Sequence, residues 1–280
     1  MDLWYSRPES PGSDFRVKVR RPLFSAESGS RRLDVLETED FGRLLLIDGR
    51  IALCESDGAA YREMAVHVPL NAHPGIRNVL VAGGGDGSIV SELVRYPSVE
   101  RIVVAEPDDG IVEASRRWFP EIAAALRDPR VAIVASDAAE LARETKERFD
   151  LVVVDYDEDE APSELGQAFY CDCFRILSGD GVLVNRAGSA LFAHKRRDLL
   201  RSAGRLKRLF PIYRLYRAAP PAGEPGELLL GFASKRYEPE EGPEAEAWRR
   251  RGIPTSYYNE EIHRAAFALP QYALELAAKI

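Results

Sequence analysis

The sequence predicts an α/β protein in which a small N-terminal antiparallel β-domain precedes a doubly wound, mostly parallel sheet. Polar and apolar residues alternate before residue 54, as in short paired strands. From residue 78 onward, apolar strands alternate with helical segments, which is the pattern of parallel β-α-β units. A glycine-rich turn joins the first of those strands to the next helix, as in many nucleotide-binding sheets.

The first domain is expected in residues 1–60. Its predicted strands alternate in polarity and comprise residues 16–19, 32–36, 43–47 and 51–53. Asp48 and Gly49 separate the last two, and an Asp-Gly pair is typical of a two-residue hairpin turn. The strands are therefore expected to pair in antiparallel fashion.

The second domain is expected in residues 61–280. It opens with a helix at 61–70, which ends before a break at His73, Pro74 and Gly75. The strands predicted beyond this break are 78–82, 101–105, 131–135, 151–154, 181–185, 212–217 and 227–234. The predicted helices are 88–95, 109–119, 138–146 and 195–209. Residues 237–247, rich in Glu and Pro, are expected to form an exposed linker to a helical piece from residue 259 onward.

The composition of the 280 residues excludes several classes of protein. A formal net charge of -7 offers no concentrated basic surface for phosphates, so no nucleic-acid partner is expected. No apolar run reaches the roughly 20 residues of a membrane span, and the first residues lack a signal-peptide pattern. A cytoplasmic protein without membrane contact is therefore predicted. The three cysteines lack a metal-ligand spacing, which indicates neither a disulfide framework nor a zinc site.

The turn after the first parallel strand is the candidate cofactor site. Gly83, Gly85 and Gly87 would let a ligand approach the backbone at the start of a helix. Alone, such a turn can simply be a tight connection. Glu106 adds specificity, because it ends the next strand 20 residues after Asp86, where Rossmann-like folds place the carboxylate that binds ribose hydroxyls. Together these residues predict a nucleoside-binding site.

Carboxylates follow four successive strands of this sheet. Asp86 lies inside the turn, where its charge would repel a pyrophosphate, so an electropositive ligand fits better. Asp137 ends the third strand and could accept from an adenine amino group, while Asp155 ends the fourth and faces the same crevice. Each of these carboxylates alone could be an exposed helix cap. As a set they suit a ligand with ribose, adenine and a cationic tail.

At this point the chain resembles the spermidine synthases, or polyamine aminopropyltransferases, along nearly its whole length. The shared motifs occur in the right order and lie at residues 3–5, 45–49, 61–64, 67–70, 83–87, 128–131 and 257–270. The resemblance implies a class I methyltransferase-like domain behind the β-domain, and a homodimer or homotetramer. It also implies transfer of an aminopropyl group from decarboxylated S-adenosylmethionine, a co-substrate, to a small-molecule amine. It implies no metal and no permanently bound cofactor.

The resemblance also implies roles for single residues. Asp86 would bind the donor amine, Glu106 the ribose and Asp137 the adenine, while Tyr61 would line the cleft. Asp155 would orient and deprotonate the attacking amine. This agrees with the chemistry of the carboxylates, because an alkylamine is mostly protonated near pH 7 and needs a base to expose its lone pair.

The acceptor side departs from the family pattern. Glu158 is the best replacement for a second acceptor carboxylate, and Arg62, Asn185 and Gly223 stand where the family usually has other residues. The acidic run at 155–160 predicts a preference for a longer cationic amine, unless that loop is merely solvated. Arg62 would repel a polyamine in the cleft but suit a carboxylate. It could instead turn outward and pair with a neighbouring carboxylate, Glu63 or Asp57.

The predicted function is therefore that of an aminopropyltransferase, with Asp155 catalytic. Candidate donor-binding residues are Gly83, Gly85, Asp86, Gly87, Glu106 and Asp137, and candidate acceptor-binding residues are Tyr61, Arg62, Glu158 and Asn185. One alternative is an S-adenosylmethionine-dependent N-methyl or aminocarboxypropyl transferase on the same fold. Another is a catalytically inactive homologue that binds nucleoside or polyamine.

Overall fold

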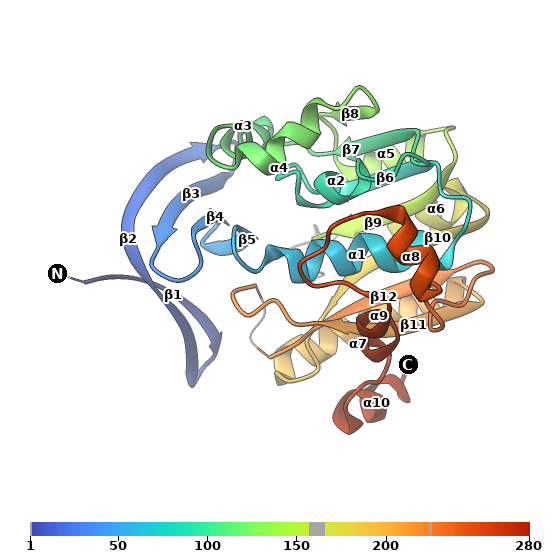
Figure 1. Ribbon diagram of the computed structural model, residues 1–280. Coiled ribbons are helices and arrows are strands. Elements are labelled where there is room, and N and C mark those ends of the chain that lie inside the picture. Colours follow the sequence, from blue (N-terminus) through green and yellow to red (C-terminus); the bar gives the residue numbers. More distant parts are fainter. Residues whose placement is uncertain (1, 157–165, 224–225) are drawn as a thin grey trace.

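The computed structural model describes residues 2–156, 166–223 and 226–280, which form two sheets with helices around the second (Figure 1). The N-terminal sheet has the strand order β1-β2-β3-β4-β5, and every neighbouring pair is antiparallel. Its strands are β1 Leu3–Ser10, β2 Ser13–Ser28, β3 Arg31–Thr38, β4 Arg43–Ile47 and β5 Arg50–Cys54. The predicted antiparallel β-domain is thus confirmed.

The predicted hairpin turn joins β4 to β5. Asp48 and Gly49 have φ values of 50° and 79°, the positive values that a twisted two-residue hairpin turn needs and that Asp and Gly tolerate best. Strand β1 and most of the long β2 were not expected, because their alternation is interrupted by Pro8 and Pro22. Register shifts mark both positions, so the strands continue past the prolines as irregular pairs.

The second sheet has the order β11-β12-β10-β9-β6-β7-β8. Strands β6 to β10 run parallel, and β11 and β12 close one edge in antiparallel fashion. The strands are β6 Asn78–Gly83, β7 Arg101–Ala105, β8 Val131–Val134, β9 Phe149–Asp155, β10 Leu177–Gly188, β11 Ile212–Ala218 and β12 Leu228–Ser234. This arrangement confirms the predicted doubly wound sheet.

Helices cover both faces of the second sheet. They are α1 Gly58–Ala72, α2 Ser88–Leu93, α3 Asp109–Trp118, α4 Pro120–Ala124, α5 Ala138–Glu144, α6 Gln167–Ile176, α7 Ala193–Leu209, α8 Ala245–Arg251, α9 Glu260–Ala266 and α10 Gln271–Ala277, with a 3-10 turn at Ala125–Arg127. Alternate strand residues point to opposite faces. Val79 and Val81 accordingly pack with α1, α2 and α9, while Leu80 and Ala82 pack with α5, α6 and α7.

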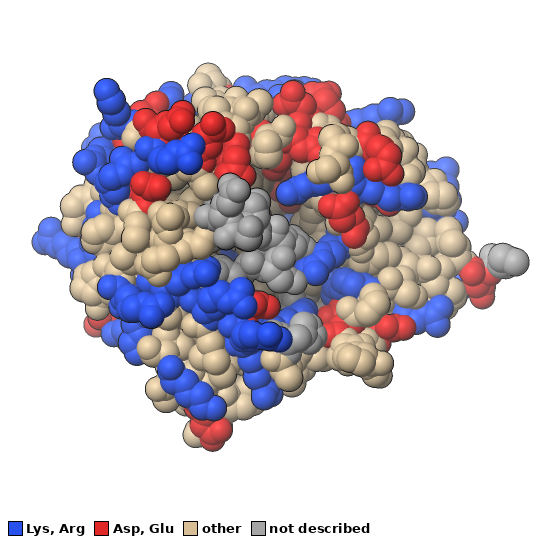
Figure 2. All heavy atoms as spheres, turned by 180° about the vertical axis from the view of Figure 1, so that it is seen from behind, with Lys and Arg blue, Asp and Glu red and all other residues tan. Residues whose placement is uncertain are grey.

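Two helical regions differ from the prediction. Helix α6 was not expected, although Phe169, Tyr170, Cys173 and Ile176 are buried at helical spacing. Helix α8 begins inside the expected linker, because Trp248 anchors it in the core beside Tyr258. Helix α7 begins two residues before its predicted start and ends where predicted. Several of its Lys and Arg side chains are exposed, and Figure 2 shows Lys and Arg side chains gathered on the lower part of the molecule seen from behind.

The order of strands creates a switch point between β6 and β9. From β6 the chain moves to β7 and β8 on one side, and then returns to β9 and β10 on the other. Gly83 at the end of β6 pairs with Asp155 at the end of β9. Ligands of open α/β sheets bind outside the carboxyl ends of the strands at such a point. A ligand is therefore expected next to Gly83 and Asp155, outside the carboxyl ends of β6 and β9.

Glu63 of α1 fixes the segment that leads from α8 to α9. Its side chain is buried, and its carboxylate accepts hydrogen bonds from the backbone N–H groups of Ser256, Tyr257 and Tyr258 at 2.8, 2.8 and 2.7 Å. A buried carboxylate with several backbone donors makes stronger hydrogen bonds than a neutral acceptor. This single side chain thus links the first helix of the second domain to the C-terminal segment.

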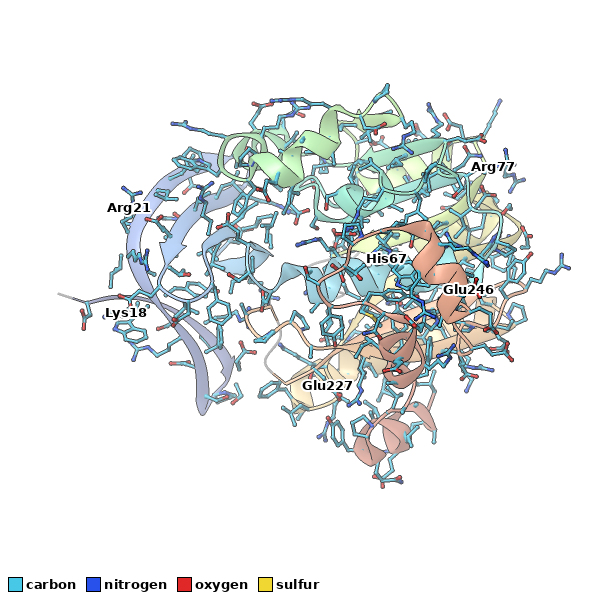
Figure 3. The ribbon with its side chains drawn as sticks, in the orientation of Figure 1. Lys18, Arg21, His67, Arg77, Glu227 and Glu246 are labelled. Carbon is cyan, nitrogen blue, oxygen red and sulfur yellow. The ribbon has the colours of Figure 1, made fainter. Side chains whose placement is uncertain are left out.

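Glu63→Gln is expected to lower the free energy of unfolding by about 1–2 kcal/mol. The amide keeps one acceptor oxygen, but its NH2 group replaces the other oxygen and faces a backbone N–H, so two donors meet without an acceptor. Urea denaturation measures this change. Glu246→Gln is the matched control, since the Glu246 side chain is 77% exposed and lies on the surface of α8 (Figure 3). Equal urea midpoints for the two variants would show that the Glu63 carboxylate does not stabilise this segment.

Candidate active site

A cavity of about 580 Å³ lies at the switch point, between the carboxyl edge of the second sheet and the N-terminal sheet. Its volume suits a nucleoside-sized ligand. Strand β1, the β4–β5 hairpin, the loop after β6 and the ends of β7 and β9 all contribute to its wall. Predicted residues on the wall are Gly83, Gly85, Asp86, Glu106, Asp137 and Asp155. The structure therefore brings four carboxylates from four strand ends to one cavity.

The glycine loop approaches Glu106 closely. A Cβ atom on Gly85 would lie 2.4 Å from the Cγ atom of Glu106, so a side chain there would push the carboxylate aside. Gly83 and Gly85 line the cavity, whereas Gly87 does not. Gly87 instead forms the N-cap of α2 with φ +81° and packs against Leu126. Gly87 therefore shapes the loop without lining the cavity.

Glu106 is 5% exposed and is held by the loop and by the start of α3. Its Oε2 atom accepts from the Gly85 N–H at 3.3 Å, and its Oε1 atom accepts from the Asp108 N–H at 3.1 Å. Burial raises the pKa of this carboxyl, and these two backbone hydrogen bonds oppose the rise. Both oxygens keep further lone pairs, so the carboxylate can accept from a diol in the cavity.

Asp86 and Asp137 each use one oxygen to accept from a backbone N–H at the start of the helix that follows, and Asp137 is the N-cap of α5. Asp86 Oδ1 accepts from the Ser88 N–H at 2.8 Å, and Asp137 Oδ1 accepts from the Ala139 N–H at 2.7 Å. Burial raises the pKa of Asp86. A cationic ligand would stabilise the ionised form of this buried carboxylate. These backbone hydrogen bonds and a ligand-binding role are therefore compatible, because each carboxylate has a second oxygen.

Tyr61 of α1 and Asp155 at the end of β9 are in direct contact. The Tyr61 hydroxyl donates a short hydrogen bond to Asp155 Oδ1, which joins α1 to the end of β9. Burial, followed by the charge of Asp155, raises the pKa of Tyr61 well above its usual value, so the phenol stays protonated and remains the donor. Asp155 is thereby held at the cavity wall with its orientation fixed.

A second, smaller cavity of about 30 Å³ continues from the first. The two share Ile51, Ala52, Arg186 and Gly223, and Tyr61 and Arg62 line only the second. The Arg62 Nε atom pairs with Glu92 Oε1 at 3.0 Å. Arg62 therefore lies at the cleft. One of the two sequence interpretations expected it to pair with Glu63 or Asp57, but its partner in the structure is Glu92.

Strand β10 presents Arg186 to the site, and the placement of Asn185 there is a correction. Asn185 is 1% exposed, lines neither cavity, and faces Gly231 on the other side of the strand. Asn185 was chosen from the family pattern, and because neighbouring residues of a strand point to opposite faces, Arg186 faces the cavity in its place. The Arg186 guanidinium lies over the Tyr61 ring, with its central carbon 4.8 Å from the ring centroid.

Sequence reasoning also missed the other cations of the cavity wall. Besides Arg186 they are Arg7, Arg31, Arg50 and Lys195. No local motif marks them, because β1 and α7 reach the cavity only through the fold.

Glu158 lies outside the described residues. Within the part of the chain that the structure describes, no cluster of His, Cys, Asp or Glu could hold a metal ion, and no helix is long and apolar enough to cross a membrane.

The sheet order and the strand-end carboxylates define a methyltransferase-like α/β fold with a nucleoside-sized cavity. Comparison with known proteins narrows this class. Residues 58–236 match the spermine/spermidine synthase domain, and residues 3–55 match the spermidine synthase tetramerisation domain. The chain belongs to the spermine/spermidine synthase family. This confirms the resemblance drawn from the sequence and identifies a transferase of the aminopropyltransferase type.

Individual relatives agree over nearly the whole chain. The polyamine aminopropyltransferase of Alkaliphilus oremlandii is 38% identical over 281 residues, with 100% of this chain and 99% of the relative covered. That of Lachnospira eligens is 40% identical, with coverage of 99% and 98%. A structure of spermidine synthase in complex with the transition-state analogue AdoDATO superposes with a TM-score of 0.93 at 30% identity, covering 99% of this chain and 96% of that one. The matched tetramerisation domain indicates that the chain assembles into an oligomer.

Proposed function

We propose that the protein transfers an aminopropyl group from decarboxylated S-adenosylmethionine to an amine and releases methylthioadenosine. The observation that carries the proposal is the convergence of Asp86, Glu106, Asp137 and Asp155 on one cavity at the switch point. Glu106 would accept from the ribose hydroxyls, Asp137 from the adenine amino group, and Asp86 would bind the donor's ammonium. A crystal structure of a relative contains a transition-state analogue of this kind of transfer, which supports the assignment.

The reaction is a direct displacement at carbon. The acceptor nitrogen attacks the carbon of the aminopropyl group that is bonded to the sulfonium sulfur. A C–N bond forms, and the bond between that carbon and sulfur breaks with its electron pair going to sulfur. Asp155 takes the proton that the acceptor amine must lose, and Tyr61 keeps that carboxylate in place by its hydrogen bond. The sulfonium is already a good leaving group, so the protein's part is to bind, orient and deprotonate.

The remaining acceptor roles are also proposals. Arg62 lines the second cavity and would contact the far end of the acceptor. Arg186 takes the place that the sequence assigned to Asn185.

We also propose a homodimer or homotetramer built through the N-terminal sheet, with the domain boundary near residue 60, since the matched family models meet close to that position. A cytoplasmic location remains a prediction from the sequence.

Donor competition tests the proposed reaction. Purified protein is given a set of amines with either decarboxylated S-adenosylmethionine or S-adenosylmethionine, and nucleoside products are separated by chromatography. The proposal expects methylthioadenosine from the decarboxylated donor. Formation of S-adenosylhomocysteine, or methylthioadenosine from S-adenosylmethionine alone, would favour a methyl or aminocarboxypropyl transfer.

Glu106→Ala is expected to weaken methylthioadenosine binding by about 1–3 kcal/mol, because the ribose loses its hydrogen-bond acceptor. Isothermal titration calorimetry measures this affinity, and circular dichroism checks that the variant is folded. Glu113→Ala is the matched control, since the Glu113 side chain is 68% exposed on α3 and does not line the cavity. Unchanged affinity in Glu106→Ala would refute the placement of the ribose.

A further inference from the structure

The hairpin between β2 and β3 reaches the start of α3, so the N-terminal sheet contacts the second domain there. Ser28 ends β2 and pairs with Arg31 at the start of β3, and Gly29 in the turn between them has a φ of 56°. The Ser28 hydroxyl donates a short hydrogen bond to Asp108 Oδ1. Figure 1 shows the ends of β2 and β3 beside α3. The contact joins two residues that are 80 positions apart in the chain.

The close fit of the hairpin depends on Gly110. A Cβ atom at this position would lie 2.1 Å from the Oγ atom of Ser28 and 2.7 Å from its Cβ atom, nearer than van der Waals contact allows. A side chain at residue 110 would therefore push Ser28 away from α3. Beside this point, Leu33 of β3 and Ile111 of α3 are buried in one apolar cluster. The hydrogen bond thus lies at the end of a packed interface.

Asp108 carries the effect of this contact to Glu106. As the N-cap of α3, its Oδ1 atom accepts from Ser28 and also from the Gly110 N–H at 2.9 Å. The backbone N–H of Asp108 donates to Glu106 Oε1 at 3.1 Å. Ser28 therefore holds the residue that supplies one of the two backbone donors to Glu106, and Gly85 supplies the other.

Ser28 does not itself line the site. It lies on the wall of neither described cavity, whereas Glu106 and Arg31 line the first. Burial raises the pKa of Glu106, and the N–H groups of Asp108 and Gly85 and the charge of Arg31 oppose that rise. Ser28 holds Asp108, and Arg31 belongs to the same hairpin. A displaced hairpin would therefore change the surroundings of Glu106 without removing any group that touches a ligand.

We propose that Ser28 is a positioning residue for the nucleoside, because its hydrogen bond to Asp108 holds the Glu106 carboxylate in the orientation that accepts from the ribose hydroxyls. A carboxylate that is fixed before binding loses less conformational freedom when the ligand arrives. Without this bond, Asp108 is held only by contacts within the second domain. The proposal rests on the proposed function, in which Glu106 binds the ribose, and extends it to a residue outside the cavity.

The test compares two nucleosides that differ only in the groups that Glu106 would bind, methylthioadenosine and its analogue without the two ribose hydroxyls. Ser28→Ala is expected to weaken methylthioadenosine binding about threefold to tenfold and to leave the affinity of the analogue unchanged, as measured by calorimetry. Ser13→Ala is the matched control, because Ser13 lies at the other end of β2, where its exposed hydroxyl contacts Ser10. An equal loss for both nucleosides in Ser28→Ala, or no loss, would overturn the proposal.

Two further variants show whether the effect passes along the inferred route. Gly110→Ala displaces the Ser28 hydroxyl from the side of α3 and is expected to give the same ribose-dependent loss. In a Glu106→Ala background, Ser28→Ala is expected to have no further effect on methylthioadenosine affinity, because the carboxylate that it positions is gone. An undiminished effect in that background would contradict the proposal. Circular dichroism checks that each variant is folded.

The outcomes separate this inference from the proposed function. If Glu106→Ala leaves methylthioadenosine affinity unchanged, the placement of the ribose is wrong and the inference fails with it. If Glu106→Ala weakens binding but Ser28→Ala has no ribose-dependent effect, only the inference fails. A ribose-dependent effect of Ser28→Ala supports the inference even if no amine is extended, because the measurements are of binding and need no turnover.

Discussion

Asp155→Asn is expected to lower turnover by about 100-fold or more while donor affinity stays near normal. General-base catalysis typically contributes at least that factor, and the amide cannot take the proton of the attacking amine. The side chain keeps its size and can still accept from the Tyr61 hydroxyl, so the geometry of the site should persist. Steady-state release of methylthioadenosine and calorimetric binding of the same nucleoside measure the two quantities.

The pH dependence makes this prediction specific. At high pH a larger share of the free amine is already deprotonated, so part of the lost activity should return in Asp155→Asn. Asp198→Asn is the control, because Asp198 pairs with Arg201 on α7 and does not line the cavity. Activity of Asp155→Asn that equals the parent at neutral and at high pH would mean that another group is the base.

Protonation of Glu92 is expected to cost about 3 kcal/mol of stability as the pH falls from about 5 to about 2. Burial of Glu92 by itself would raise its pKa, but the contact with His67 and the positive charges of Arg95 and Arg62 outweigh burial and lower the pKa to about 2. In the unfolded chain the pKa is near its ordinary value of 4.5. The stabilisation is therefore complete above pH 4.5 and is lost as the pH falls through the folded-state pKa.

Glu92→Gln tests this assignment. The variant is expected to be less stable than the parent at pH 7, because three cationic or polar partners lose a buried carboxylate, and the difference should shrink toward pH 2. Urea denaturation at several pH values follows both proteins. A difference in unfolding free energy that does not change with pH would show that Glu92 contributes by packing alone. Figure 3 shows His67 in the interior beside α8, where this contact lies.

Much of the site could be predicted because its carboxylates are tied to local signals. Glu106, Asp137 and Asp155 each end or follow an apolar strand, and the carboxyl ends of parallel strands meet at one edge. The glycine loop before Asp86 is equally local. The sequence alone therefore indicated a nucleoside site and the family to which the chain belongs.

The cations of the site could not be predicted in this way. Arg7 lies on β1 at the other end of the chain, and only the fold brings it to the wall of the cavity. The partner of Arg62 is 30 residues away on α2, so the nearer carboxylates were the only candidates that the sequence offered. Asn185 was chosen from the family pattern and not from the alternation of the strand, so its neighbour Arg186, which faces the cavity, was overlooked.

Mass spectrometry of the amine products tests the central claim most directly. The purified protein is incubated with decarboxylated S-adenosylmethionine and a set of amines that includes polyamines and amino acids, and the products are identified by mass and fragmentation. The account predicts an amine extended by one aminopropyl group, formed in equal amount to methylthioadenosine and lost in Asp155→Asn. A product extended by a methyl or aminocarboxypropyl group, or no extended amine from any acceptor, would contradict it.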